Sequence, residues 1–129
     1  MSASQEHLTP DQHGGLLWQP EAETMPRTEL VALQIERLQR VLRNANENVP
    51  YYRKSLAAAG VTPADIASIE DIARLPFTTK TDLRDHYPFG MFARPRTEIV
   101  RVHASSGTTG NPTTVGYTRS DIEVWGDLI

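Results

Sequence analysis

The sequence contains no cysteine among its 129 residues. Disulfide bonds, thiolate metal sites and thioester formation on a protein thiol are therefore excluded within these residues. The absence is also typical of proteins of the reducing cytoplasm, and cytoplasmic is the location that we expect.

Long apolar runs and clusters of one charge are also missing. No stretch approaches the roughly 18 apolar residues of a membrane span, and residues 1–10 lack the basic and apolar regions of a secretory signal. The 13 Lys and Arg residues are scattered and the formal net charge is −3, which gives no long-range attraction to nucleic acid. We therefore expect neither a membrane nor DNA or RNA as a partner. What remains is a globular composition at the length of one domain.

Residues 1–24 are predicted to form a flexible polar leader. The leader contains His7 and His13, but two histidines without further ligands make a poor metal site. No metal site is therefore predicted in this chain.

Residues 25–95 are predicted to form a helical amino-terminal subdomain. Thr28 is placed to cap a long helix that Pro50 ends, because a proline lacks the N–H that a helix interior needs. The apolar positions of this helix recur at helical spacing and are Val31, Ile35, Leu38, Leu42 and Ala45. A second helix, 51–59, would close at Gly60. Short helices are expected where a cap residue precedes an acid by three positions, at Thr62 and Asp65, Ser68 and Asp71, and Thr79 and Asp82.

From Thr97 the pattern changes to period two, which predicts a strand through Ala104 and a returning strand over 114–118. Ser120 and Glu123 fit a capping box that opens one more helix, and the sequence ends at Ile129 before that helix is complete. Two strands do not make a stable sheet by themselves. We therefore expect a mixed α/β fold in which residues 96–129 begin a larger, incomplete domain.

The loop between the two strands is the candidate functional site. It reads Ser-Ser-Gly-Thr-Thr-Gly-Asn-Pro-Thr from Ser105 to Thr113, with two glycines and little bulk. Glycine lets backbone N–H groups converge on an anion, and hydroxyl side chains add donors. The loop is not of the Walker type, because no lysine follows Gly110 and a strand comes next. Composition alone leaves a surface turn without a ligand as the alternative.

The string over residues 101–113 resembles the signature of adenylate-forming ligases, and within them the phenylacetate–coenzyme A ligase branch. Residues 75–84, 87–90 and 115–118 are also similar to that branch, and the resemblance extends from about Val49 onward. Many superfamily members have a lysine after the loop proline, where this chain has Thr113. A threonine at this position is similar to the phenylacetate–coenzyme A ligase branch. Asn111 stands where the branch often has lysine, so we expect no charge contribution from that position.

The resemblance implies an AMP-forming acid–thiol ligase of aromatic acid catabolism. Such enzymes convert phenylacetate, ATP and coenzyme A to phenylacetyl-CoA, AMP and diphosphate through an acyl adenylate, with Mg²⁺ accompanying the ATP. Residues 96–129 would then begin the ATP-binding large domain. The phosphate contacts would come from Ser105, Ser106, Gly107, Thr108, Thr109, Gly110, Asn111 and Thr113. No catalytic residue is assigned and the aryl acid is left open, because the aryl pocket, the adenine contacts and the adenylation lysine would lie further along. We expect the chain to be an amino-terminal part, inactive alone.

Two other readings stay open at this point. The apolar stripe of the long helix could bind a partner, with the loop only a turn, or the chain could be a ligase-derived module that binds nucleotide without turnover. The stripe spans barely two heptads, so core packing or a homodimer accounts for it more simply.

His103 and a polar cluster on the helix after Thr79 are further candidates for a functional role. His103 could act as a general base, but its place in a strand beside Arg101 favours a hydrogen bond within the sheet. The cluster consists of Asp82, Arg84, Asp85 and His86. We interpret it as a solvated face or an interdomain contact.

Overall fold

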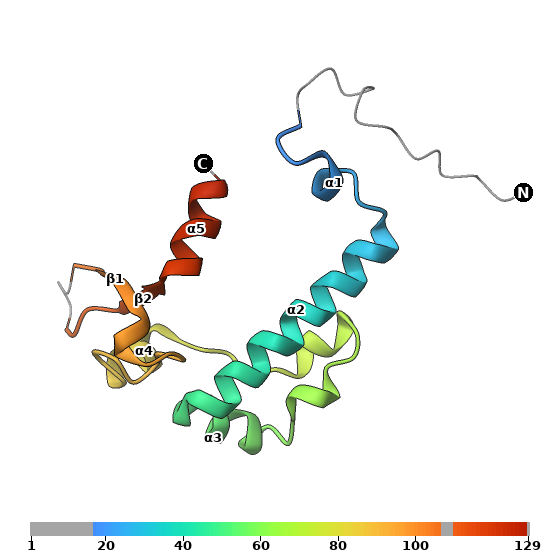
Figure 1. Ribbon diagram of the computed structural model, residues 1–129. Coiled ribbons are helices and arrows are strands. Elements are labelled where there is room, and N and C mark those ends of the chain that lie inside the picture. The colour runs from blue at the N-terminus through green and yellow to red at the C-terminus, as the bar shows by residue number, and fades with distance from the viewer. Residues whose placement is uncertain (1–16, 107–109, 129) are drawn as a thin grey trace, which may run out of the picture.

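The computed structural model describes residues 17–106 and 110–128, and Figure 1 shows a helical part followed by a β-hairpin with one helix beside it. The helices are α1 (Pro20–Glu23), α2 (Arg27–Asn48), α3 (Pro50–Ala58), α4 (Lys80–Asp85) and α5 (Arg119–Asp127). Short 3₁₀ turns span Pro63–Asp65, Glu70–Arg74 and Arg96–Glu98, and the strands are β1 (Ile99–Ala104) and β2 (Thr114–Thr118). The predicted mixed α/β class is confirmed. Within the described residues, no helix has both the length and the apolar character to cross a membrane.

Most of the expected leader, including His7 and His13, lies outside the described residues. Its last part forms α1, where Pro20 occupies the first turn and the Glu23 carboxylate accepts a hydrogen bond from the Gln19 N–H at 2.7 Å. The Trp18 indole N–H donates to the carbonyl of Asp127 in α5 at 3.1 Å. The end of the leader therefore contacts the last helix.

Helix α2 begins one residue before the predicted cap. Pro26 is its N-cap and Arg27 its first residue, so the prediction that Thr28 caps the helix is wrong. The reason is local: proline fixes its own φ, here −54°, and the chain enters the helix directly after it. The helix ends at Asn48 as expected, and Pro50 then opens α3 at the position where its missing N–H costs nothing.

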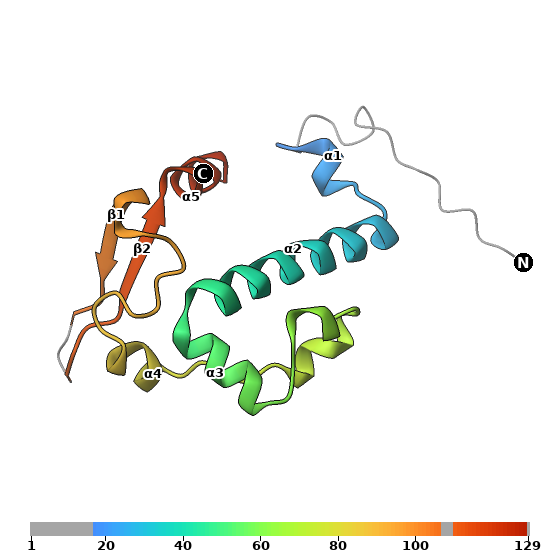
Figure 2. The same ribbon diagram turned by 60° about the horizontal axis from the view of Figure 1, so that its bottom comes forward.

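A small apolar core joins α2, α3 and the segment that follows. Ile66, Val49, Leu56 and Val61 are at most 5% exposed. Leu38 and Leu42 of α2, together with Leu75, pack against Leu56, Val61 and Ile66. Part of the predicted stripe therefore serves as core. Figure 2 shows α3 and the segment that follows it next to each other along one side of α2.

The end of α3 follows the predicted pattern. Gly60 has φ +63°, and the Val61 N–H reaches back to the Leu56 carbonyl at 3.0 Å. This is the backbone arrangement that glycine makes accessible after a helix. The reciprocal pairs predicted further on are also present. The Asp65 and Asp82 carboxylates each accept the N–H of their cap threonine at 2.7 Å, and Asp71 that of Ser68 at 2.8 Å.

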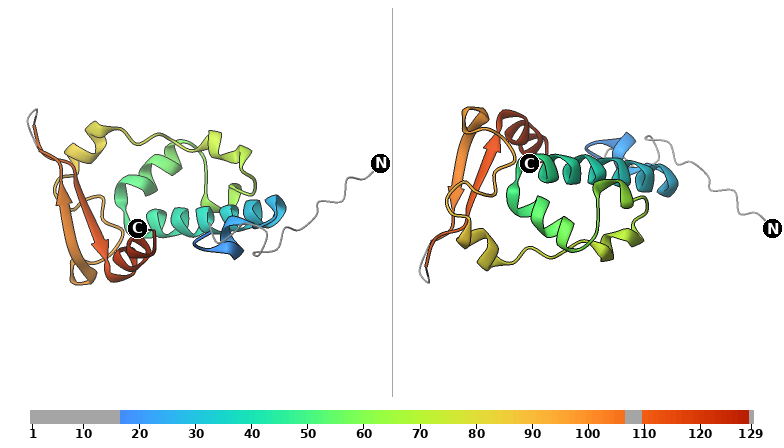
Figure 3. Two further views of the ribbon diagram at one scale, coloured as in Figure 1. Left: turned by 90° about the horizontal axis from the view of Figure 1, so that it is seen from above. Right: turned by 90° about the horizontal axis from the view of Figure 1, so that it is seen from below.

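The two strands form the predicted antiparallel hairpin. Its register pairs Arg101 with Tyr117, Val102 with Gly116, His103 with Val115 and Ala104 with Thr114. Figure 3 shows the hairpin at one end of the molecule and the first turns of α2 at the other. Helix α5 follows β2 directly and contacts it.

The cap of α5 differs from the prediction of Ser120 and Glu123. The Thr118 hydroxyl accepts the Asp121 N–H at 3.3 Å, and the Asp121 carboxylate accepts the Thr118 N–H at 2.8 Å. Thr118 is the last residue of β2, and its extended backbone, φ −79° and ψ 172°, is the conformation that an N-cap requires. The helix therefore starts two residues earlier than predicted. The Asp121 carboxylate also accepts the Thr118 hydroxyl at 2.7 Å, and its two hydrogen bonds from the Thr118 N–H and hydroxyl hold the pKa of Asp121 below its usual range.

Candidate functional site

The candidate loop is closed at its base by one pair of residues. The Ser105 N–H donates to the Thr113 carbonyl at 3.0 Å. The Thr113 N–H donates to the Ser105 Oγ at 3.1 Å, and the Thr113 hydroxyl donates to the same oxygen at 2.9 Å. These bonds extend the strand register by one pair beyond Ala104 and Thr114. Ser105 and Thr113 therefore form the last hydrogen-bonded pair of the hairpin, at the base of the candidate loop.

The described residues of the loop are open to solvent where a ligand would approach. Ser105, Ser106, Gly110 and Asn111 are exposed, whereas Thr113 is half-buried. Gly110 has φ +126°, a conformation that side chains rarely adopt, and apart from its chain neighbours no atom of the described residues lies within 4 Å of the position that a Cβ would take. Gly107, Thr108 and Thr109, three of the predicted binding residues, lie outside the described residues.

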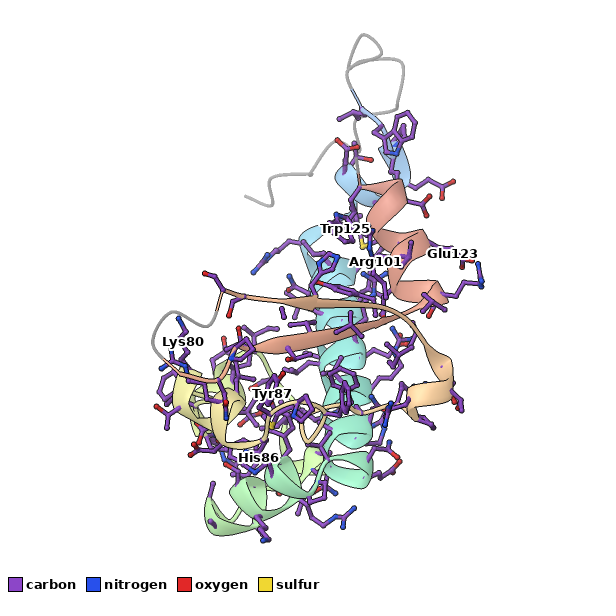
Figure 4. All side chains as sticks on the ribbon, turned by 90° about the vertical axis from the view of Figure 1, so that its left-hand side faces the viewer. Lys80, His86, Tyr87, Arg101, Glu123 and Trp125 are labelled. Atoms are coloured by element: carbon purple, nitrogen blue, oxygen red, sulfur yellow. The ribbon has the colours of Figure 1, made fainter. Side chains whose placement is uncertain are left out.

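The strand that leads into the loop is held by an aromatic cluster that sequence reasoning missed. The His103 ring lies edge-on to Tyr117 and Trp125, with centroids 5.1 and 5.8 Å apart, and Tyr117 stacks on Trp125 at 5.6 Å. The Arg101 guanidinium lies 6.0 Å from the centroid of the Trp125 ring. Figure 4 shows Arg101 and Trp125 close together where the hairpin meets α5. His103 thus has a packing role two residues before Ser105.

The opposite face of the hairpin is covered at Gly116. A Cβ at this position would lie 2.5 Å from the Phe92 ring. Phe92 in turn contacts Phe89 edge-on at 5.3 Å, and the Arg96 guanidinium lies 4.6 Å from the Phe89 centroid. Aromatic side chains therefore contact the hairpin on both faces, at His103 and Tyr117 on one face and at Gly116 on the other.

The polar cluster on α4 makes contacts within the described part of the chain. The Asp82 carboxylate accepts hydrogen bonds from the Thr79 N–H at 2.7 Å and the Thr79 hydroxyl at 2.6 Å, which hold its pKa below the usual range. The His86 ring lies edge-on to Tyr51 of α3 at 5.0 Å. Burial raises the pKa of Tyr51, and its hydrogen bond to Asp82 raises it further. His86 is near Tyr87, below the hairpin in Figure 4, and the cluster joins α4 to α3.

A cleft of about 470 Å³ lies between α2, the segment around Phe92 and the hairpin. Its walls include Val41, Tyr52, Phe92 and Arg94. The described residues of the loop do not line it, so the cleft and the candidate site are separate features. Across residues 17–106 and 110–128, no group of three or more His, Cys, Asp or Glu side chains could hold a metal ion.

The chain is similar to known ligases in both sequence and fold. It is 57% identical over 114 residues to a phenylacetate-coenzyme A ligase of Thermus thermophilus, which covers 88% of this chain and 26% of that protein. It is 58% identical over 107 residues to a phenylacetate-coenzyme A ligase of Aromatoleum evansii, covering 83% of this chain and 24% of that protein. No protein-family model matches the chain.

Among solved structures, the chain matches a 2-hydroxyisobutyryl-CoA ligase in complex with 2-HIB-AMP and CoA. The TM-score is 0.75 at 40% identity, over 93% of this chain and 26% of that one. The helices and hairpin therefore have the fold of one part of an acyl-CoA ligase of the adenylate-forming class. Within this class, the chain belongs to the phenylacetate–coenzyme A ligase family. It spans about a quarter of the length of the curated relatives it matches, which confirms the prediction that the resemblance is to part of such a ligase.

Proposed function

We propose that this chain supplies the ATP phosphate-binding loop of an AMP-forming phenylacetate–coenzyme A ligase. In this reaction the carboxylate of phenylacetate attacks the α-phosphate of ATP, diphosphate leaves, and the acyl group passes from AMP to the thiol of coenzyme A. The described chain contributes to the first half-reaction. It binds and orients the phosphates that become the leaving group.

The observation that carries the proposal is the closed loop between Ser105 and Thr113 in a chain of this family. The hydrogen bonds between Ser105 and Thr113 fix the base of the loop and hold the Ser105 hydroxyl in place before the ligand arrives. Pre-positioned donors stabilise developing charge without reorganisation during the reaction. The donors present fit a phosphate, since Ser105 and Ser106 expose hydroxyls and Gly110 leaves space for close backbone approach.

The described residues are not proposed to bind magnesium, coenzyme A or the aryl acid. No acidic cluster of the described chain fits a metal ion. We propose that Mg²⁺ accompanies the phosphate oxygens of ATP, where it would neutralise their charge. We further propose residues 25–95 as a helical subdomain that supports the hairpin, and the cytoplasm as the location.

The test uses a complete ligase in which this chain replaces the aligned segment of the Thermus thermophilus relative. We expect the chimera to catalyse ATP–diphosphate exchange that depends on phenylacetate. Gly107→Val should lower this exchange by about tenfold or more, because a side chain in the loop displaces donors from the phosphates. Gly126→Ala, a substitution in α5 with no atom within 4 Å of the new Cβ, is the control. Exchange undiminished by Gly107→Val would contradict the phosphate role.

A further inference from the structure

Ser105 and Thr113 have different hydrogen-bonding capacities left over after they close the loop. A serine hydroxyl has two acceptor positions and one proton. Both acceptor positions of the Ser105 Oγ are used by Thr113, one by its N–H at 3.1 Å and one by its hydroxyl at 2.9 Å. The Ser105 proton therefore points to a group other than Thr113.

Thr113 is in the opposite situation. Its hydroxyl proton is donated to Ser105, so the same proton is not available to an anion. An anion such as phosphate offers only acceptors, so the Thr113 oxygen in this arrangement has nothing to donate to it. Burial agrees with this difference, since Thr113 is half-buried at the base of the loop and Ser105 is exposed.

We propose that Thr113 is a positioning residue, which turns the Ser105 hydroxyl proton toward a phosphate oxygen of the nucleotide and does not itself contact the phosphates. This division of roles rests on the proposed function of the loop. It differs from the sequence-based expectation that Thr113 is one of the residues that contact the phosphates. A side chain at position 113 that has no hydroxyl cannot donate a hydrogen bond to the Ser105 Oγ. The Ser105 hydroxyl proton should then adopt other orientations.

The test is a double-mutant cycle on the chimeric ligase, read by phenylacetate-dependent ATP–diphosphate exchange at varied ATP. Ser105→Ala removes the donor and should lower kcat/KM for ATP by about tenfold or more, as expected for a hydrogen bond to a charged group. Thr113→Val keeps the shape and loses the hydroxyl, and should lower it by about threefold to tenfold. Thr113→Ser keeps a hydroxyl and should restore activity to within about twofold.

The decisive comparison is Thr113→Val in the Ser105→Ala background. If Thr113 acts only through Ser105, the second substitution adds less than about a twofold loss, because the interaction that it disturbs is already gone. Thermal denaturation of each variant separates this coupling from unfolding.

Each outcome decides between the alternatives. If the losses in kcat/KM of the two single variants multiply in the double variant of an active chimera, the division of roles is wrong. Full activity of Thr113→Val would contradict it as well. Either result leaves the proposed function standing. A chimera without phenylacetate-dependent exchange would overturn the proposed function, and the donor role of Ser105 with it.

Discussion

Substituting Gly116 by alanine should destabilise the hairpin, and the structure gives the reason atom by atom. The new Cβ would lie 2.5 Å from Cε2, 2.7 Å from Cζ and 3.1 Å from Cδ2 of Phe92, and real Cβ atoms essentially never come closer than 3.0 Å to a neighbour. The ring is held from behind, because Phe89 contacts it edge-on at 5.3 Å. Phe92 must therefore leave its place or the strand must shift.

Overpacking of this kind costs about 1–3 kcal/mol in the free energy of unfolding. Urea denaturation of the chain, followed by circular dichroism, measures this cost. The matched control is Gly126→Ala in α5, where the added Cβ meets nothing within 4 Å and should stabilise the helix by up to about 1 kcal/mol. In a Phe92→Leu background, Gly116→Ala should cost less, since the clashing ring atoms are gone. Equal effects of alanine at positions 116 and 126 would refute the packing of Phe92 on the hairpin.

Three further predictions concern the helix ends. Thr118→Ala should destabilise α5 by about 0.5–2 kcal/mol, while Thr118→Ser, which keeps the capping hydroxyl, should change the helical circular dichroism signal little. Gly60→Ala should cost about 1–2 kcal/mol in urea denaturation because φ is +63°, and Gly60→Asn should cost less. Hydrogen bonds hold the pKa values of four capping aspartates below the ordinary 3.8, and these are Asp65, Asp71, Asp82 and Asp121. The ionised carboxylates therefore stabilise the folded state above that pH, and this stabilisation is lost as the pH falls through the pKa values of the folded state. Unfolding should therefore become easier as the pH falls below about 4, and less steeply so in Asp82→Asn; a slope unchanged by that substitution would contradict the capping role.

The helical part could be predicted where local chemistry decides the outcome. The apolar spacing of α2, the proline at position 50 and the glycine at position 60 act on their own few residues, and the structure has them as expected. The two caps that were wrong lie where neighbouring signals compete. Two pairs of residues fit the same capping pattern, Thr118 with Asp121 and Ser120 with Glu123. The first pair caps α5 because β2 ends at Thr118, where the strand still pairs with Ile99. That pairing depends on tertiary structure and not on spacing.

The loop between the two strands could be predicted from its residues, whereas the hydrogen bonds between Ser105 and Thr113 at its base required the strand register. Once the hairpin is assumed, the register that pairs Ala104 with Thr114 would have placed Ser105 opposite Thr113. The aromatic cluster needed more, because Trp125 reaches His103 and Tyr117 only when α5 folds back beside the strands. The spacing of residues in the sequence does not define the angle at which α5 packs on the strands, so the packing role of His103 could not be predicted.

The most direct test of the phosphate loop is a crystal structure of the chimeric ligase with a non-hydrolysable ATP analogue. The account predicts the Ser105 Oγ at about 2.5–3.0 Å from a phosphate oxygen, with the Thr113 hydroxyl still bonded to Ser105. An analogue whose phosphates lie away from residues 105–113, or contact Thr113 and not Ser105, would contradict it.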